Sequence, residues 1–213
     1  MSDEKLRLAV LLSGSGTTLQ NFIDLTSAGD LPGEVVKVVS SRSEVFGLER
    51  ARRAGIPSAV VRRSDFASLE EFSMAVWREV DAREVDLLLF AGFMVQLAIP
   101  PDWEGRVMNV HPALLPAFGG KGMYGHFVHE AVLEEGCKVT GATVHFVNNE
   151  YDRGPIVIQK AVAVLENDDA DSLAERVQAA EREIYPEAVR LYAAGRLKLE
   201  DRRVRVLSPE ASD

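Results

Sequence analysis

The sequence is almost without cysteine: Cys137 is the only one in 213 residues. A single cysteine excludes an intramolecular disulfide and a cysteine-cluster metal site, and it is compatible with a reducing compartment. The surrounding segment E-E-G-C-K provides no local partner that would activate a thiol. We therefore interpret Cys137 as a structural residue.

Long apolar runs are also missing. The longest, L-L-L-F-A-G-F-M-V at 87–95, is far shorter than a membrane span, and the opening M-S-D-E-K-L-R lacks the apolar core of a signal peptide. Positive charge is scarce, because 24 basic side chains face 33 acidic ones and the net charge is −9. We expect a cytoplasmic protein with no membrane or nucleic-acid partner. In such an acidic chain an anionic substrate needs a local site of positive potential to bind.

What is present is an alternation of short apolar runs with helical patterns, the signature of a parallel α/β sheet with βαβ units. A later pair of alternating segments lacks a long helix between its members and predicts an antiparallel extension. A long helix with Pro186 as a kink and a small final hairpin in L-K-L-E-D-R-R-V-R-V-L complete the expected single folded unit. The predicted strands are 6–12, 35–40, 58–61, 86–90, 106–110, 139–147 and 156–164, and the predicted helices are 18–25, 46–54, 68–82 and 171–194.

Two polar residues interrupt the apolar run V-M-N-V-H-P-A-L-L-P at 107–116. Asn109 and His111 are two apart on a predicted strand, so their side chains project to the same face. Pro112 restricts the backbone of His111 to extended conformations. The pair lies at the carboxyl end of the strand, where open α/β sheets place their ligand crevice.

A glycine-rich turn, S-G-S-G-T-T at 13–18, joins the first strand to the first helix. It lacks the third glycine of a dinucleotide fingerprint, and the second strand ends in S-S-R without the acidic residue that holds an NAD ribose. Two interpretations stay open, a simple tight turn and a cradle for a monophosphate whose oxygens accept free backbone N–H groups.

Other candidates are weaker on their own. Residues 90–97 favour core packing over a ligand pocket, and Asp152 in isolation is a surface turn carboxylate, although beside His111 it would favour the protonated imidazole and orient the ring. His126 and His129 have the spacing of metal ligands on one helix face but no third ligand, which favours surface or cap roles. His145 is best interpreted as a structural histidine. We therefore expect no metal.

Taken together, the ordered segments S-G-S-G-T-T-L-Q, F-G-L-E-R-A, A-G-F-M, N-V-H-P-A-L-L-P, T-V-H-F-V, Y-D-R-G-P-I and R-V-Q-A-A-E-R-E-I-Y-P resemble the glycinamide ribonucleotide formyltransferase family of purine biosynthesis. The resemblance spans nearly the whole chain. It implies one Rossmann-like formyltransferase domain over 1–213, with a mostly parallel sheet, an antiparallel C-terminal extension and helices on both faces. Residues 1–110 would form a nucleotide-binding half and 111–213 a folate-binding and C-terminal half.

The resemblance also implies the substrates, 10-formyltetrahydrofolate and glycinamide ribonucleotide, in a monomer or homodimer. The implied catalytic residues are Asn109, His111 and Asp152. The residues implied to bind the acceptor are Gly16, Thr17, Thr18, Gln178, Ala179, Ala180 and Glu181. Those implied to contact the folate are Met94, Val95, Gln96, Leu97, Asn109, Asn148, Asn149, Glu150, Tyr151 and Asp152.

Two segments depart from the family. Leu69 stands where many members carry an arginine, which removes an expected contact to the folate tail. The segment 119–126 differs from the shorter loop of many relatives, where Lys121 either compensates or is a solvated lysine.

The implied chemistry suits these residues. An amine attacks the formyl carbon, and Asn109 with protonated His111 would donate to the formyl oxygen as negative charge builds on it. Formyltetrahydrofolate hydrolase and methionyl-tRNA formyltransferase share such a site but usually carry an additional domain, for which we expect no room in 213 residues. A non-catalytic nucleotide-binding module would leave the Asn109–His111 pair unexplained.

Overall fold

A computed structural model describes residues 5–209. The chain divides into two compact units, Met1–Met108 and Asn109–Asp213, which we describe separately.

The first unit contains a four-stranded sheet in the order β3-β2-β1-β4, in which β2 pairs with β3 and β1 pairs with β2 and β4, all in parallel. Both faces of its central strands are covered, because every residue from Leu8 to Leu12 is buried. This continuous burial explains the apolar runs in the sequence. The elements are β1 (Leu6–Leu12), α1 (Thr17–Ala28), β2 (Gly33–Ser40), α2 (Phe46–Arg53), β3 (Ser58–Val60), η1 (Arg63–Asp65), α3 (Leu69–Glu79), β4 (Leu87–Phe90) and η2 (Pro101–Trp103).

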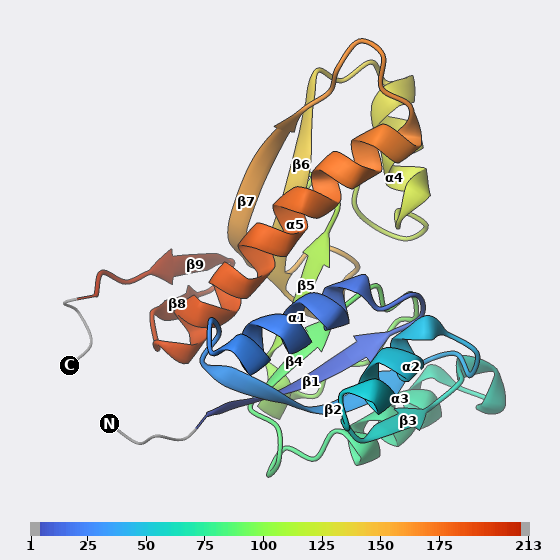
Figure 1. Ribbon diagram of the computed structural model, residues 1–213, viewed down its shortest axis with the longest axis vertical. Helices are drawn as coiled ribbons and strands as arrows, with labels where there is room; N and C mark the ends of the chain where they lie inside the picture. The colour runs from blue at the N-terminus through green and yellow to red at the C-terminus, as the bar shows by residue number, and fades with distance from the viewer. Residues whose placement is uncertain (1–4, 210–213) are drawn as a thin grey trace. The chain divides into compact units, whose positions relative to one another are not determined.

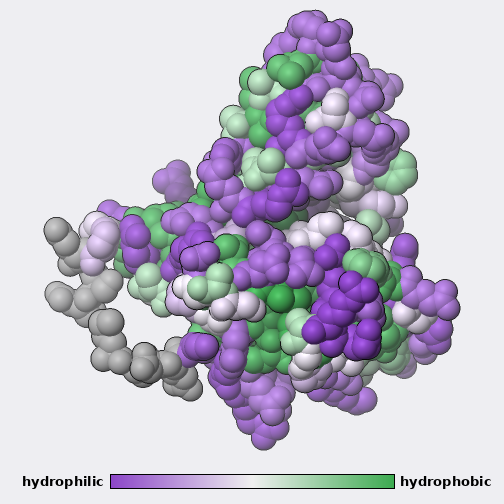
Figure 2. Space-filling model, viewed as in Figure 1, coloured by the Kyte–Doolittle hydropathy of each residue, from purple (hydrophilic) through white to green (hydrophobic). Residues whose placement is uncertain are grey.

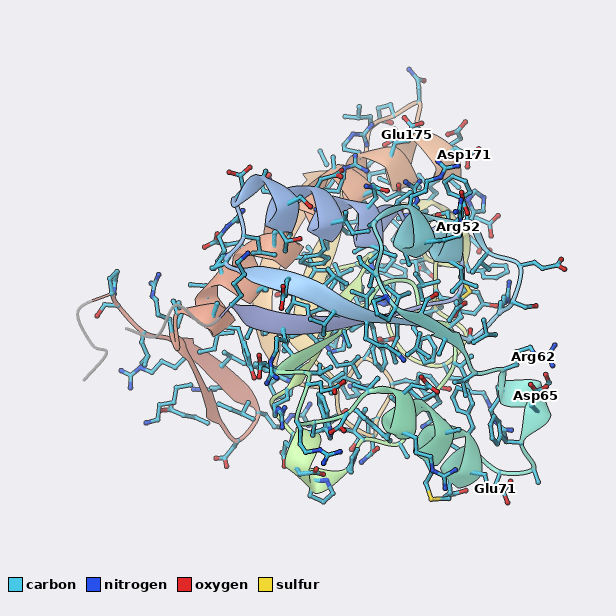
Figure 3. The ribbon with its side chains drawn as sticks, turned by 60° about the horizontal axis from the view of Figure 1, so that its bottom comes forward. Arg52, Arg62, Asp65, Glu71, Asp171 and Glu175 are labelled. Carbon is cyan, nitrogen blue, oxygen red and sulfur yellow. The ribbon has the colours of Figure 1, made fainter. Side chains whose placement is uncertain are left out.

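Helices lie on both sides of this sheet: α2, with the labelled Arg52, lies on one side and α3, with Glu71, on the other (Figure 3). Glu49 on α2 accepts from Arg52 and Arg53, which lower the pKa of its carboxyl to about 2. Figure 2 shows the strongly hydrophilic surface that results over α2. Ser68 caps α3 by accepting from the Glu71 N–H, as expected at a helix start.

The second unit holds the strand order β5-β6-β7-β9-β8, with β6–β7 and β8–β9 antiparallel. Its long helix α5 packs against β6 and β7, and α4 packs against α5 (Figure 1). The elements are β5 (Val107–His111), α4 (His126–Glu134), β6 (Val139–Phe146), β7 (Ile156–Ala163), α5 (Ala170–Ala193), β8 (Leu197–Glu200) and β9 (Arg203–Val206).

The α/β class, the parallel strands, the antiparallel extension and the final hairpin predicted from sequence are confirmed. Helix α5 runs without a break through Pro186. Helix α4 was not expected, because it is short and offers only a brief apolar repeat in Val128 and Val132 after a glycine-rich segment. No helix among residues 5–209 combines the length and apolarity needed to cross a membrane.

Candidate active site

Asn109 and His111 lie at the end of β5, as the sequence predicts. The His111 side chain is buried, and its Nε2 lies 2.8 Å from the carbonyl oxygen of Phe118. A carbonyl only accepts hydrogen bonds, so Nε2 carries a proton and Nδ1 is the nitrogen left for chemistry.

Asp152 faces that nitrogen. Its Oδ2 is 3.7 Å from His111 Nδ1, and the carboxylate is only 14% exposed. The same oxygen accepts the Gly120 N–H at 2.8 Å, which fixes its position. At 3.7 Å Asp152 acts on the imidazole by charge, whereas the Phe118 carbonyl orients the ring by a hydrogen bond.

His145 completes the group from β6. Its Nδ1 donates to the Phe146 carbonyl at 2.8 Å, and burial lowers the pKa of the ring. The neutral ring therefore presents Nε2 as an acceptor, 3.3 Å from the Asn109 amide nitrogen. This contact identifies the end of Asn109 that faces His145 and leaves a second N–H of the same amide free to donate.

The backbone around this group is strained. Phe118 and Asp152 both have φ of 52°, in the left-handed region that side chains disfavour. Gly119 lies between them in space, where a Cβ would come within 2.5 Å of the Leu115 side chain and 3.2 Å of the Asp152 Cβ. Phe118 and Asp152, which supply the carbonyl and the carboxylate around His111, thus both have unfavourable backbone conformations that the surrounding packing maintains.

A buried polar network holds the segment that follows β5. Thr143 donates to the Ala113 carbonyl at 2.6 Å and accepts from the Leu115 N–H at 3.0 Å. Gln159 donates to both the Leu115 carbonyl and the Thr143 hydroxyl. These contacts fix the chain between His111 and Phe118, so the histidine and its carbonyl partner keep their relative position.

The sequence reasoning missed several of these contributors. His145 hydrogen-bonds to the Phe146 carbonyl, as expected of a structural histidine, but its other ring nitrogen also contacts Asn109. The T-V-H segment of β6 repeats the spacing of N-V-H in β5, a signal that could have indicated Thr143 and His145. No sequence signal could have indicated the Phe118 carbonyl, because any residue type supplies one.

In the first unit, the turn before α1 has the features of an anion cradle. Gly16 adopts φ of 71°, and no side chain caps the helix, so the first backbone N–H groups of α1 lack an intrahelical partner. Arg50 of α2 braces the turn by donating to the Ser15 carbonyl at 3.0 Å and to the Gln20 side chain at 2.9 Å. A Cβ on Gly16 would lie 2.7 Å from the Gly47 Cα, which makes glycine necessary there.

The segment after β4 is divided between surface and core. Met94 is 48% exposed, Val95 and Gln96 are half-buried, and Leu97 is only 3% exposed. The core interpretation is thus wrong for Met94 and confirmed for Leu97. The Ser13 hydroxyl holds this segment in place, because it accepts the Met94 N–H at 3.0 Å.

The remaining predicted contacts lie in the second unit. Asn148, Asn149, Glu150 and Tyr151 form an exposed turn in which the Asn148 side chain accepts the Glu150 N–H. On α5, Gln178 and Ala179 are exposed and Ala180 is buried. Glu181 is half-buried, and burial raises the pKa of its carboxyl to about 7.

The expectation for the other histidines was half right. His126 is exposed and pairs with Glu130 and Asp171. His129 is buried, contrary to the surface or cap role predicted for it, because it lies on the inner face of α4 with Val128 and Val132. Among residues 5–209, no three His, Cys, Asp or Glu side chains form a group that could hold a metal ion.

Comparison with known proteins gives a consistent answer. A family model described as formyl transferase matches residues 6–189. The chain is 38% identical over 198 residues to phosphoribosylglycinamide formyltransferase of Escherichia coli K12, with 92% of this chain and 91% of that protein covered. Glycinamide ribonucleotide transformylase 1 from Symbiobacterium toebii has 44% identity and a TM-score of 0.89, with 96% and 95% of the two chains covered.

Longer relatives contain the same region. The trifunctional purine biosynthetic protein adenosine-3 of Drosophila melanogaster is 41% identical over 216 residues, which is 100% of this chain but 15% of that protein. The chain thus spans only a small part of these trifunctional relatives, whereas it matches the bacterial proteins over nearly their whole length. The chain therefore belongs to the formyl transferase family, and within it to the phosphoribosylglycinamide formyltransferases.

Proposed function

We propose that this chain transfers the formyl group of 10-formyltetrahydrofolate to the primary amine of glycinamide ribonucleotide, which yields formylglycinamide ribonucleotide and tetrahydrofolate. The observation that carries the proposal is the arrangement of Asn109, His111 and Asp152, held by His145 and the Phe118 carbonyl in a chain of which 92% matches a relative of this family.

The folate supplies an activated formyl group, and the chain supplies donors and a charge. The free N–H of Asn109 and the Nδ1–H of protonated His111 donate to the formyl oxygen as the acceptor amine attacks. Asp152 stabilises the charged imidazole across 3.7 Å. The same carboxylate then accepts, through water, the proton that the attacking amine loses and returns it to the folate nitrogen, which leaves as its bond to the formyl carbon breaks.

The binding roles rest on the features of each segment. Exposed Met94 and Tyr151 offer apolar surface for the folate ring, and the half-buried side chains of Val95 and Gln96 lie beside Met94. Leu97 contributes through its backbone, since its side chain is buried. The N–H groups of Thr17 and Thr18 bind the acceptor phosphate, and the exposed Gln178 and half-buried Glu181 hydrogen-bond its ribose.

The test is product analysis with both substrates. We expect formylglycinamide ribonucleotide and tetrahydrofolate in equal amounts, with turnover that requires the amine. Formyltetrahydrofolate deformylase from Pseudomonas syringae shares the fold at 23% identity, so formate is measured in the same reaction. Formate release independent of the amine would contradict the proposal.

A further inference from the structure

The Ser13 side chain connects two of the proposed binding segments in the first unit. One is the acceptor turn, residues 13–18, and the other is the folate segment, residues 94–97. The Ser13 hydroxyl is buried and accepts the Met94 N–H at 3.0 Å, and the Ser13 N–H donates to the Gly92 carbonyl at 3.0 Å. The first residue of the acceptor turn is therefore hydrogen-bonded to the start of the folate segment through both its backbone and its side chain.

A third segment fixes the same hydroxyl. It lies 2.6 Å from the hydroxyl of Ser41, which follows β2, and both side chains are buried. A serine hydroxyl has one proton to give and two lone pairs, so Ser13 can satisfy Ser41 and Met94 together. A displacement of Ser13 would leave these buried polar groups without partners, which costs free energy. Ser13 and the Met94 N–H are therefore held as one unit.

The rest of the acceptor turn is short and braced. Arg50 of α2 donates to the Ser15 carbonyl at 3.0 Å, and Gly16 opens helix α1, whose first N–H groups we assign to the acceptor phosphate. The phosphate site and the hydroxyl that holds Met94 thus belong to one constrained stretch of chain. A change in order at one end of this stretch reaches the other end.

We infer that Ser13 is a positioning residue that couples the acceptor turn to the folate segment, so that each substrate raises the affinity of the enzyme for the other. The inference rests on the proposed function, which assigns the two segments. A ligand that immobilises the turn also immobilises the Met94 N–H, and the second ligand then loses less conformational freedom on binding. Both substrates are anionic, so direct repulsion between them would give coupling of the opposite sign.

The experiment uses inorganic phosphate as the probe for the acceptor turn and tetrahydrofolate as the probe for the folate segment, so that no formyl transfer occurs. We expect saturating phosphate to lower the Kd of tetrahydrofolate about fivefold, and tetrahydrofolate to lower the Kd of phosphate by the same factor, because coupling is reciprocal. Ser13→Ala offers no oxygen to the Met94 N–H and should abolish both effects. Calorimetry measures these values, and equal coupling in wild type and Ser13→Ala would overturn the inference.

Ser73→Ala is the matched control. The buried Ser73 hydroxyl of α3 accepts the Ala98 N–H at 3.0 Å, just beyond the folate segment. This variant removes the same kind of hydrogen bond without touching the acceptor turn. It should lose stability as Ser13→Ala does but keep the coupling between phosphate and tetrahydrofolate. If both variants lost the coupling to the same degree, Ser13 would have only a structural role and the inference would be wrong.

Amide hydrogen exchange separates this inference from the proposed function, and it needs only the wild-type protein. Saturating phosphate should slow the exchange of the Thr17 and Thr18 N–H groups and, through Ser13, slow that of the Met94 N–H about fivefold. Protection of the turn without protection of Met94 would overturn the inference and leave the phosphate site intact. A turn that phosphate does not protect would contradict the proposed acceptor site, and the inference with it.

Discussion

At the scale of single residues, the chemistry depends on which nitrogen of each histidine is committed to a backbone carbonyl. His111 uses Nε2 for Phe118 and keeps Nδ1, whereas His145 uses Nδ1 for Phe146 and keeps Nε2. Asp152 lies 3.7 Å from the remaining nitrogen of His111 and 3.8 Å from that of His145, and burial lowers the pKa of the His145 ring, so that its neutral form accepts from Asn109. Two similar side chains thus receive different roles from their surroundings.

His111→Ala should remove most turnover and leave acceptor affinity nearly intact, because its N–H donates chiefly to charge that develops in the transition state. We expect kcat to fall about 10²–10³-fold, as for the loss of one oxyanion donor. Steady-state kinetics and calorimetry with glycinamide ribonucleotide test this. A near-normal kcat in a folded variant would refute the catalytic role.

Asp152→Asn should reduce turnover steeply, because it removes the negative charge 3.7 Å from His111 Nδ1 and the group that accepts the proton of the attacking amine. Asparagine keeps an oxygen that can accept the Gly120 N–H, so the variant mainly removes charge. Steady-state kinetics provide the measurement, and calorimetry with glycinamide ribonucleotide checks that the variant still binds its acceptor. A near-normal kcat would leave Asp152 as a structural residue.

At the scale of elements, helix α1 and helix α5 each place a predicted binding segment. The start of α1 needs glycine because it combines a positive φ with the close approach of α2. The start of α5 is fixed by a capping box of Asp169 and Ser172, and Arg176 binds both oxygens of Asp168 just before it. This anchored start sets the direction from which α5 presents Gln178 and Glu181.

Gly16→Ala should lower the free energy of unfolding by about 1–3 kcal/mol, from backbone strain and contact with Gly47. It should also weaken the binding of the acceptor phosphate. Gly29→Ala is the matched control, because Gly29 ends the same helix at φ of 80° and a Cβ there meets nothing within 4 Å. Urea denaturation and acceptor calorimetry compare the two, and unchanged acceptor affinity in folded Gly16→Ala would reduce the turn to a structural feature.

Glu181→Gln should stabilise the protein at alkaline pH. The pKa of this carboxyl is raised from 4.5 to about 7, so the folded state resists its ionisation while the unfolded state does not. The resulting destabilisation is absent below pH 4.5, grows from there to pH 7 and is constant above it. We expect a gain of about 1–3 kcal/mol at pH 8 and none at pH 4, measured by urea denaturation. Weaker acceptor binding by the same variant would support the ribose contact.

At the scale of the whole molecule, buried histidines oppose Glu181 in the same pH range. Burial lowers the pKa of both His129 and His145 below 6.5. Below pH 6.5 these histidines become protonated in the unfolded chain but stay neutral in the folded protein. Their contribution to the free energy of unfolding is therefore complete above pH 6.5 and is lost as the pH falls. The net pH dependence of stability is the sum of these opposite contributions.

His129→Leu isolates one of them. His129 is buried in α4 with an Nδ1 that has no hydrogen-bond partner among the described residues, so leucine removes both an unsatisfied nitrogen and a titrating group. We expect the variant to be more stable than wild type by about 1 kcal/mol or more at pH 5.5, with a smaller difference at pH 8. Thermal denaturation of wild type and variant at both pH values tests this. The contribution of Glu181 to the pH dependence is the same in both proteins, so it does not affect the difference between them. A difference that did not depend on pH would show that burial does not shift the pKa of His129 away from its value in the unfolded chain.

The sequence by itself determined the α/β class, most of the strands and helices and the family, and it predicted Asn109, His111 and Asp152 as site residues. Local patterns carry this information, because side-chain period, turn residues and ordered motifs are properties of neighbours in the chain. Helix α4 was not predicted because its apolar repeat is short, and His129 was for the same reason assigned to the surface although it is buried.

Only the tertiary structure decided how those residues are held. The Phe118 carbonyl on His111 follows the backbone of a strained loop, and the contact of His145 with Asn109 joins positions 36 apart. The hydrogen bonds that join Ser13 to Ser41 and Met94 likewise draw on three separate segments. Such contacts depend on backbone atoms and on chain segments distant in sequence, and neither leaves a periodic signal in the order of residue types.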